Sequence, residues 1–365
     1  MDSLEHITHS LCTLEFEVRR DPYYWILNAL DLYRPNVWEF SRLNLTTNVM
    51  SKRRLNKLVT QNYVDGWDDP RILTVDGLKR RGYTPAAINN FCKTIGVTRT
   101  ENLINIQLLE HFCRQDLDTN ASRAFAVLNP LKITLSNVAE DRYDTINAPN
   151  FPADPSKGTH PIVFSRTIYI DRSDFRLQDS KEYYGLAPGK EVFLKYAYNI
   201  KCEEVKMSKP GSSNVDDVLE LVCSVDFKNS NKVKGSIHWI ARPSPSEETP
   251  RTAEIRIYDY LFNHENPSAE EDWLNFLNPN SKKVIPNAMI DTHLFNTAKA
   301  WEKFQFERVG FFSVDPDSVL TSDPSTTRKL VFNSTVTLKQ SKEKRSLDKA
   351  MPSASSPAAA APTSK

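Results

Sequence analysis

Glycine is scarce in this chain: 10 residues of 365 are glycine. An average protein has about 7% glycine, more than twice this share. The sequence contains no G-x-G-x-x-G and no G-x-x-x-x-G-K-[ST]. These are the two common glycine-rich loops that hold nucleotide phosphates. If the protein binds a nucleotide, it must therefore do so with another kind of site.

Cysteine pairs and long apolar runs are also absent. The five cysteines are scattered and none forms a C-x-x-C pair, which argues against a disulfide scaffold or a zinc site. No apolar run approaches the roughly 18 residues that a membrane span needs. The opening residues lack the basic and apolar stretches of a secretory signal. We therefore expect a cytoplasmic protein with no membrane partner and no protein-bound metal site.

The net charge is close to zero, but the charges are unevenly distributed. The chain has 47 Lys and Arg against 46 Asp and Glu, a net charge of +1. Residues 52–99 hold ten Lys and Arg against four Asp, whereas residues 240–280 hold three Arg against eight acidic residues. The first segment forms a basic stripe of the kind that binds RNA phosphates. An ordinary solvated helical face would explain the same charges.

The first third of the chain has α/β and then helical patterns. Residues 1–68 read as mixed α/β, with a helix at 23–33. From 69 to 126 the pattern is helical. Thr74 and Thr84 are typical N-cap residues, and glycines at 82 and 96 mark the helix ends. A third helix is predicted at 104–118, and a short fourth helix beginning at Ser122.

The remainder reads as β structure. About eight short strands separated by Pro, Asn, Asp and Gly follow residue 128 and predict two small barrels or sandwiches. After about residue 340 the sequence becomes charged and then low in complexity, and we expect it to be disordered. The predicted strands lie at 132–138, 163–170, 191–200, 218–227, 233–241, 253–262, 304–314 and 330–338.

The strongest local motif is M-S-K-R-R at 50–54. It predicts a mobile loop that brings cations and a small hydroxyl to one place, where they could stabilise a triphosphate under attack. A second copy, K-M-S-K-P at 206–210, lies between two predicted strands. We interpret that copy as a hairpin turn without catalytic function.

The context of the first motif is a series of ordered motifs that extends over nearly the whole chain up to about residue 340. They are T-H-S-L-C-T-L-E-F (8–16), W-E-F-S-R-L-N-L (38–45), M-S-K-R-R-L-N-K-L-V (50–59), D-G-W-D-D-P-R (65–71), G-L-K-R-R-G-Y (77–83), R-A-F-A-V-L-N-P-L-K (123–132), P-G-K-E-V-F-L-K-Y-A-Y-N-I-K (188–201), V-K-G-S-I-H-W (233–239), I-R-I-Y-D-Y-L-F (255–262), F-Q-F-E-R-V-G-F-F (304–312) and F-N-S-T-V-T-L (332–338). Together these motifs resemble the glutaminyl-tRNA synthetases, which are class I aminoacyl-tRNA synthetases.

The resemblance implies a multidomain fold from the C-terminal two-thirds of such an enzyme. The implied parts are part of a class I Rossmann-type catalytic domain, a small helical connector, two all-β anticodon-binding barrels and a disordered tail. The implied boundaries are 1–68 for the catalytic part and 69–126 for the connector. The proximal barrel would comprise 127–182 and 262–340, the distal barrel 183–261 and the tail 341–365.

The resemblance also implies the reaction of a glutamine–tRNA ligase of the cytoplasmic, eukaryotic-like type. ATP, L-glutamine and tRNA(Gln) give glutaminyl-tRNA(Gln), AMP and pyrophosphate, and Mg²⁺ would accompany ATP. By the same likeness Thr13, Arg42 and Leu43 line the ATP site. An ion pair of Arg42 with Glu39 or another carboxylate is the structural alternative. The implied catalytic loop, which also contacts ATP, contains Met50, Ser51, Lys52 and Arg53.

Cys12 is the predicted determinant of amino-acid choice. The matching position in the sister glutamyl enzymes carries arginine, which suits a γ-carboxylate, whereas a small neutral thiol suits a carboxamide. A buried, inert cysteine is the alternative. Val37 and Val18 replace polar residues of the family, which puts two substrate contacts in doubt.

The motif of the family's first half is missing. No H-x-G-H occurs in these 365 residues. We therefore expect the chain alone not to form an adenylate and expect residues 1–68 to expose a sheet edge and an apolar face. A non-catalytic tRNA-binding module and a glutamate–tRNA ligase are the alternatives.

The implied tRNA contacts fall into two groups. Those of the helical region would meet the inner side of the L-shaped tRNA, and those of the barrels would meet unpaired anticodon bases. Gln305 and Arg308 are three residues apart, so a strand would place them on opposite faces unless a turn or bulge intervenes. The full set is Lys79, Arg80, Arg81, Thr98, Arg99, Asn102, Arg123, Lys195, Gln305, Arg308 and Thr335.

Overall fold

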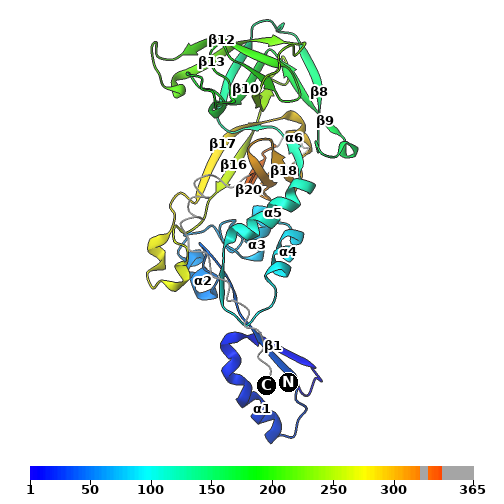
Figure 1. The fold of residues 1–365 in the computed structure, drawn as a ribbon, viewed down its shortest axis with the longest axis vertical. Coiled ribbons are helices and arrows are strands. Elements are labelled where there is room, and N and C mark those ends of the chain that lie inside the picture. The colour runs from blue at the N-terminus through cyan, green and yellow to red at the C-terminus, as the bar shows by residue number, and fades with distance from the viewer. Residues whose placement is uncertain (321–327, 339–365) are drawn as a thin grey trace, which may run out of the picture.

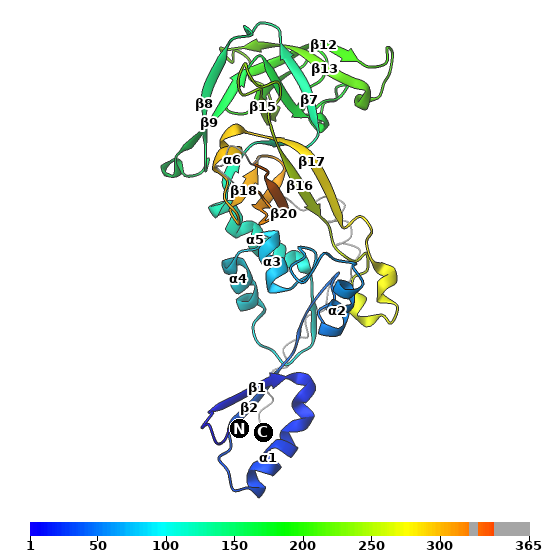
Figure 2. The ribbon, with the colours of Figure 1, turned by 180° about the vertical axis from the view of Figure 1, so that it is seen from behind.

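The computed structural model describes residues 1–320 and 328–338, so the predicted tail at 341–365 lies outside the described residues. Figure 1 shows an elongated molecule in which an α/β region, a group of helices and two barrel-like sheets follow one another along the long axis. The same order is seen from behind (Figure 2). The predicted order of a partial α/β region, a helical connector and two barrels is confirmed.

The N-terminal region is one β-α-β unit. Strand β1 (His9–Thr13) runs parallel to β2 (Asn36–Phe40), and α1 (Arg20–Ala29) connects them. Parallel sheets are normally covered on both faces. Here Trp25 is 71% exposed and Trp38 is 51% exposed. The expected open apolar face is therefore present.

The helical region is joined to this unit by a short parallel ladder between β3 (Leu43–Leu45) and β4 (Asn102–Ile104). The predicted caps are confirmed, since the Thr74 hydroxyl accepts a hydrogen bond from the Gly77 amide and Gly82 has a φ of 110°. Within the described residues, every helix is too short or too polar to span a bilayer. The helices are α2 (Lys52–Thr60), α3 (Val75–Arg81), α4 (Pro85–Ile95) and α5 (Ile106–Asn120).

The proximal barrel is the sheet that packs against these helices. Its core contains Phe306 and Phe312, whose rings stack with their centroids 4.4 Å apart. Helix α6 (Thr292–Thr297) contacts β16 of this barrel. The strands run in the order β5 (Ser122–Ala124), β18 (Lys303–Phe306), β19 (Gly310–Val314), β20 (Val331–Thr337), β16 (Arg251–Tyr258), β17 (Lys282–Ile290) and β6 (Ala126–Val127).

The distal barrel lies at the far end of the molecule (Figure 1). Its core is centred on buried aromatic residues such as Trp239 and Phe164, and the β8–β9 hairpin extends beside it. The strands of the sheet run in the order β14 (Ser236–Ile237), β11 (Glu191–Leu194), β12 (Asn199–Met207), β13 (Val218–Asp226), β7 (Pro130–Leu135), β10 (Thr167–Asp171) and β15 (Trp239–Ala241), and the hairpin strands are β8 (Tyr143–Pro149) and β9 (Thr159–Ser165).

Short 3-10 helices connect the larger elements. They lie at Leu14–Arg19, Pro155–Lys157, Arg172–Asp174, Val215–Asp217, Pro267–Ala269 and Trp273–Phe276. The one at Arg172–Asp174 follows β10 directly and lies where the two barrels meet, because Asp174 pairs with Arg308 of the proximal barrel.

The barrel boundaries differ from the prediction. Strands β7 and β10, within the segment 127–182 predicted as proximal, pair with β13 and β15 of the distal sheet. Strand β16, within the segment 183–261 predicted as distal, pairs with β17 and β20 of the proximal sheet. The chain therefore crosses between the barrels earlier than expected. Periodicity along the sequence reveals strands but not their distant hydrogen-bonding partners.

Two local predictions have opposite outcomes. The predicted helix beginning at Ser122 is wrong, because Ser122 begins β5, which pairs in parallel with β18. The second M-S-K copy does lie at the β12–β13 hairpin, as predicted. There Lys206 and Lys209 form ion pairs with Glu220 and Asp217 at 3.1 and 3.4 Å.

Arg80 joins helix α3 to the proximal barrel. Its guanidinium donates to Asp68, Asp315 and Asp317 at 2.9, 3.0 and 2.7 Å. The side chain of Asp315 is completely buried and also accepts a hydrogen bond from Asn333. Burial alone would raise the pKa of Asp315, but the hydrogen bonds from Arg80 and its neighbours hold that pKa below its ordinary value.

Replacing Arg80 with methionine should reduce the free energy of unfolding by about 3 kcal/mol near neutral pH, because the buried Asp315 charge loses its main partner. Asp315 has a lowered folded pKa, so its pairing contributes above the ordinary carboxyl pKa and is lost as pH falls through the folded pKa. Urea unfolding at neutral and acidic pH measures both effects, and the cost of the substitution should shrink in acid.

The exposed Arg19→Met variant is the control and should change the free energy of unfolding by less than about 0.5 kcal/mol. Equal effects of the two substitutions would contradict a special role for Arg80.

Candidate functional site

The predicted nucleotide-contacting residues gather at the carboxyl ends of β1 and β2. Thr13 ends β1, and Arg42 and Leu43 follow β2. Ligands of α/β folds bind at such strand ends. Arg42 pairs with Glu15 at 2.5 Å, and both side chains are about half exposed. A hydrogen bond with Thr13 and the nearby Arg42 guanidinium lower the pKa of Glu15.

The M-S-K-R-R motif lies at the start of a helix rather than entirely in an open loop. Ser51 is the N-cap of α2, and its hydroxyl accepts a hydrogen bond from the Arg54 amide at 3.4 Å. Lys52 and Arg53 are exposed in the first turn, while Met50 packs against the helical core. The amide groups and dipole of a helix N-terminus favour anions. The motif therefore combines two accessible cations with a helix end.

Arg54 has a structural role in the same motif. Its guanidinium donates to the carbonyls of Pro267 and Glu270 at 2.7 and 3.0 Å and lies 5.4 Å from the ring centroid of Trp273. This arginine therefore fixes α2 to the long segment between β16 and β17.

Cys12 is partly buried on β1, opposite Glu39 of β2. Glu39 is only 1% exposed, and it pairs with Arg20 rather than with Arg42. The ion pair that was the alternative role for Arg42 is therefore formed with Glu15. Glu39 pairs instead with Arg20 and fixes α1 to the sheet. In the described ranges, no group of three His, Cys, Asp or Glu side chains is suited to a metal ion.

The predicted contacts of the helical region differ in accessibility. Lys79, Thr98 and Asn102 are exposed, and the Lys79 ammonium lies 4.8 Å from the ring centroid of Trp301. Arg99 is partly exposed and forms an ion pair with Glu17.

Arg80 and Arg81, the remaining predicted contacts of the helical region, are engaged within the protein. The three carboxylates described above occupy Arg80. Arg81 donates to the carbonyls of Thr335 and Tyr258 at 3.3 and 3.4 Å. The predicted contact of Arg80 and Arg81 with RNA is untested, and these internal hydrogen bonds do not support it.

A cluster of polar groups lies at the junction of the two barrels. Arg123 on β5 and Gln305 on β18 are directly opposite each other. Gln305 is 8% exposed, and its Oε1 has no hydrogen-bond partner within the described residues. Glu307 accepts hydrogen bonds from Lys195 Nζ at 2.7 Å and from the Tyr196 hydroxyl at 2.6 Å. The structure thus brings Arg123, Gln305 and Lys195 to one region.

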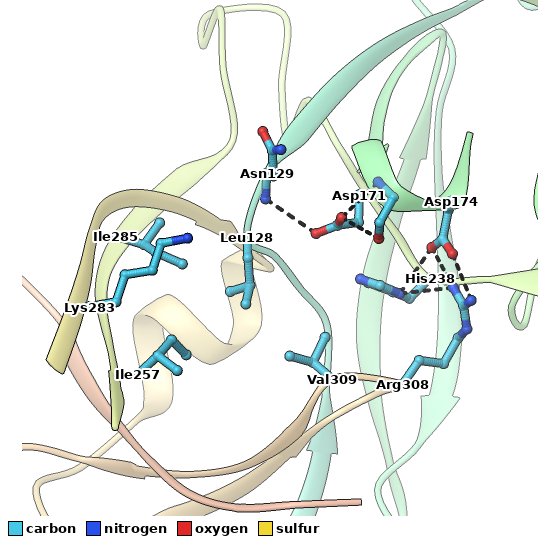
Figure 3. A pocket seen from close by; sticks show the side chains of 11 residues that line it. Leu128, Asn129, Asp171, Asp174, His238, Ile257, Lys283, Ile285, Arg308 and Val309 are labelled. Atoms are coloured by element: carbon cyan, nitrogen blue, oxygen red, sulfur yellow. Dashed lines mark hydrogen bonds and ion pairs between the residues drawn. The ribbon is translucent and has the colours of Figure 1, made fainter. Parts of the chain in front are cut away.

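Arg308 lies in the turn between β18 and β19 and has a φ of 67°. Arg308 therefore lies outside the strand that contains Gln305, so the two side chains need not point to opposite faces of one strand. The guanidinium makes a two-pronged ion pair with Asp174, with Nη2 2.7 Å from Oδ1, and its Nη1 lies 3.3 Å from Nδ1 of His238 (Figure 3). A cavity of about 650 Å³ opens beside this group, between the barrels.

Thr335 is separate from this junction. It is 1% exposed, and its hydroxyl donates to the Arg81 carbonyl at 2.7 Å, where the helices pack on the proximal barrel. A Cβ at Gly82 would lie 2.4 Å from the Thr335 hydroxyl, so this contact is close. Burial supports packing for Thr335 and does not support its predicted RNA contact.

Sequence reasoning missed three residues of the junction: Asp174, His238 and Glu307. Glu307 stands inside the F-Q-F-E-R motif and His238 inside S-I-H-W, so proximity to predicted residues was an available signal. No pattern marks Asp174, because its partner is 134 residues away.

Comparison with known proteins gives a consistent result along the chain. Residues 1–119 match the family described as tRNA synthetases class I (E and Q), catalytic domain. Residues 121–226 and 236–315 match two families, each described as the anti-codon binding domain of tRNA synthetases class I (E and Q).

Individual relatives match over most of the chain. A probable glutamine–tRNA ligase of Dictyostelium discoideum is 52% identical over 345 residues, covering 94% of this chain and 42% of the relative. A cytoplasmic glutamine–tRNA ligase of Arabidopsis thaliana is 50% identical, covering 93% and 42%. A glutamine–tRNA ligase of Tolumonas auensis is 45% identical, covering 93% and 60%. The chain thus spans 42 to 60% of these curated relatives, less than the predicted two-thirds.

Replacing Thr335 with valine should reduce the free energy of unfolding by about 1 kcal/mol, because the buried Arg81 carbonyl loses a hydrogen-bond donor. RNA affinity should stay unchanged, since the side chain is buried. Urea unfolding and filter binding of RNA measure the two quantities. The exposed Thr145→Val variant is the control for stability. A large loss of RNA affinity with unchanged stability would restore the predicted RNA contact.

Proposed function

The chain belongs to the class I tRNA synthetases of the glutamate and glutamine (E and Q) type, and from this premise we propose that it serves in glutamine–tRNA ligation as the part that recognises tRNA(Gln). The observation that carries the proposal is the junction of the barrels. Lys195, Gln305 and Arg308 lie there, and Arg308 lines a cavity of about 650 Å³. Unpaired RNA bases are typically recognised by such recessed polar edges.

The complete reaction joins glutamine to tRNA in two steps. The glutamine carboxylate attacks the α-phosphorus of ATP, which releases pyrophosphate, and the adenylate then passes its acyl group to the terminal ribose of the tRNA. Lys52 and Arg53 at the start of α2 would stabilise the phosphates, with Ser51 and Met50 shaping the turn.

The nucleotide would lie against the strand ends. Thr13 and Leu43 would contact ATP, and Arg42 would exchange its Glu15 partner for a phosphate oxygen. Mg²⁺ would arrive bound to ATP, because the described residues offer no three-ligand acidic or histidine cluster of their own.

Cys12 is the proposed contact with the glutamine side chain. A neutral thiol leaves room for a carboxamide and does not attract a γ-carboxylate. Its partly buried position on β1, one residue before Thr13, places it next to the proposed nucleotide contacts. This feature favours glutamine–tRNA ligation over glutamate–tRNA ligation.

The tRNA would lie along the length of the molecule. Lys79, Thr98, Arg99 and Asn102 of the helical region would contact its backbone, which gives affinity that depends on salt. Arg123, Lys195, Gln305 and Arg308 of the barrels would contact the anticodon.

A non-catalytic tRNA-binding module is the second candidate. The exposed apolar side chains of the N-terminal unit, including Leu11, Trp25 and Trp38, favour it, because this two-stranded parallel sheet has an unpaired outer edge on each strand and an uncovered apolar face. The proposed cellular location is the cytoplasm for either candidate.

Replacing Arg308 with methionine should weaken binding of tRNA(Gln) by about 10- to 100-fold, because base-edge contacts from arginine discriminate by this amount. Filter binding at two salt concentrations is the measurement. The exposed Arg251→Met variant on the same barrel is the matched control. An equal loss on a minihelix without an anticodon would contradict the assigned role, and equal retention of unrelated tRNAs would refute specific recognition.

The 365 residues by themselves should not support ATP–pyrophosphate exchange above background, even with glutamine and tRNA present. The physical reason is the open β1–β2 sheet, which supplies strand ends and cations from one side of a nucleotide site. Robust exchange by the purified chain would overturn this expectation. It would also rule out the second candidate function, a tRNA-binding module without catalytic activity.

A further inference from the structure

The cavity between the barrels has two kinds of wall. Leu128, Ile257, Ile285 and Val309 provide apolar surface, while Arg308 and His238 lie at the opposite side (Figure 3). A nucleobase needs such a combination, because its faces are apolar and its edges carry hydrogen-bonding groups. The volume of about 650 Å³ is larger than one base requires.

The hydrogen bonds of His238 determine which ring nitrogen carries its proton. Nδ1 lies 3.3 Å from Nη1 of Arg308, and a guanidinium can only donate. Nδ1 must therefore accept, which leaves the proton on Nε2. The ring is 3% exposed, and burial lowers the pKa of His238 in spite of nearby Asp174, so the neutral form is favoured.

The Nε2–H group of His238 has no hydrogen-bond partner in the part of the chain that the structure describes. Figure 3 shows this nitrogen directed into the cavity, away from Asp174 and Arg308. A buried donor without a partner is unfavourable and therefore uncommon. It indicates that a group bound in the cavity supplies an acceptor.

The carboxylates that line the cavity already have donors. Both oxygens of Asp174 accept from Arg308. Asp171 accepts from the Asn129 amide at 3.2 Å and from the amide and hydroxyl of Ser173 at 3.1 and 2.7 Å. Asp171 and Asp174 are therefore engaged, whereas the donor of His238 is directed into the space.

We propose that His238 is a specificity-determining residue whose Nε2–H donates to a carbonyl oxygen of an unpaired RNA base in this cavity. The proposal rests on the proposed tRNA recognition and deepens it. Uracil O4 and guanine O6 are carbonyl oxygens at the ring positions where cytosine and adenine carry an amino group. An amino group would face the Nε2–H donor with another donor. For a base that turns this edge towards His238, the site therefore selects uracil or guanine over cytosine or adenine, and Arg308, fixed by Asp174, holds the tautomer of His238.

The direct test deletes the carbonyl oxygen from the RNA rather than the histidine from the protein. In tRNA(Gln) transcripts, each anticodon uracil is replaced by 2-pyrimidinone and each guanine by 2-aminopurine, one position at a time. At one position the loss of the oxygen should weaken binding to the unmodified chain about tenfold. Uniformly small effects at every position would overturn the proposal.

Two variants separate reading of the base from positioning of Arg308. In His238→Asn the side-chain oxygen can still accept from Arg308, but nothing reaches the position of Nε2. In His238→Gln an amide N–H reaches that position. We expect His238→Asn to bind natural tRNA about tenfold more weakly and to be insensitive to deletion of the carbonyl, and His238→Gln to recover part of both.

The controls distinguish this proposal from the broader one. The exposed His111→Asn variant should bind like the unmodified chain, and melting curves of all variants check folding. If the unmodified chain does not bind tRNA(Gln), the proposed function fails. If it binds, but His238→Asn retains full sensitivity to the carbonyl, the histidine has only a packing role and this inference fails alone.

Discussion

The turn between β18 and β19 holds the two barrels together through two ion pairs, to which it contributes one negative and one positive side chain. Glu307 of the proximal barrel accepts from Lys195 of the distal barrel, and the next residue, Arg308, pairs with Asp174 of the distal barrel. Because neighbouring residues carry opposite charges, the junction is electrically balanced, and each charge fixes its partner across the interface. Arg308 has a positive φ, and from this turn both side chains reach the distal barrel.

This junction also shows how the proposed RNA-reading surface can be ordered in the absence of RNA. A guanidinium has five N–H donors, and Asp174 and His238 engage three of them in the described structure. The remaining donors are held in a fixed direction, so a bound base would not have to order a flexible arginine. Glu307 partly neutralises Lys195, so the proposed affinity for RNA at this point would depend on geometry more than on net charge.

The helical region is attached by similar means. Arg80 reaches three carboxylates, and Arg81 donates to backbone carbonyls of the barrel side. Two of the three cations in Lys79-Arg80-Arg81 therefore stabilise a domain interface. The exposed Lys79 beside them is better placed for RNA phosphates. A basic stripe in a sequence can thus combine interface and ligand-binding roles, and only the partners of each side chain separate them.

The sequence by itself determined most of the element types, the capping of α3 and α4 and the order of the regions, because periodicity, cap residues and turn residues act over a few neighbours. It also predicted correctly that the second M-S-K copy lies at a hairpin. Tertiary structure alone decided that β7 and β10 belong to the distal barrel, that Ser122 begins a strand and that Thr335 is buried. It alone placed His238 and Asp174 against Arg308. These outcomes depend on pairings across many tens of residues, and local physical chemistry does not specify which distant partner completes a hydrogen bond.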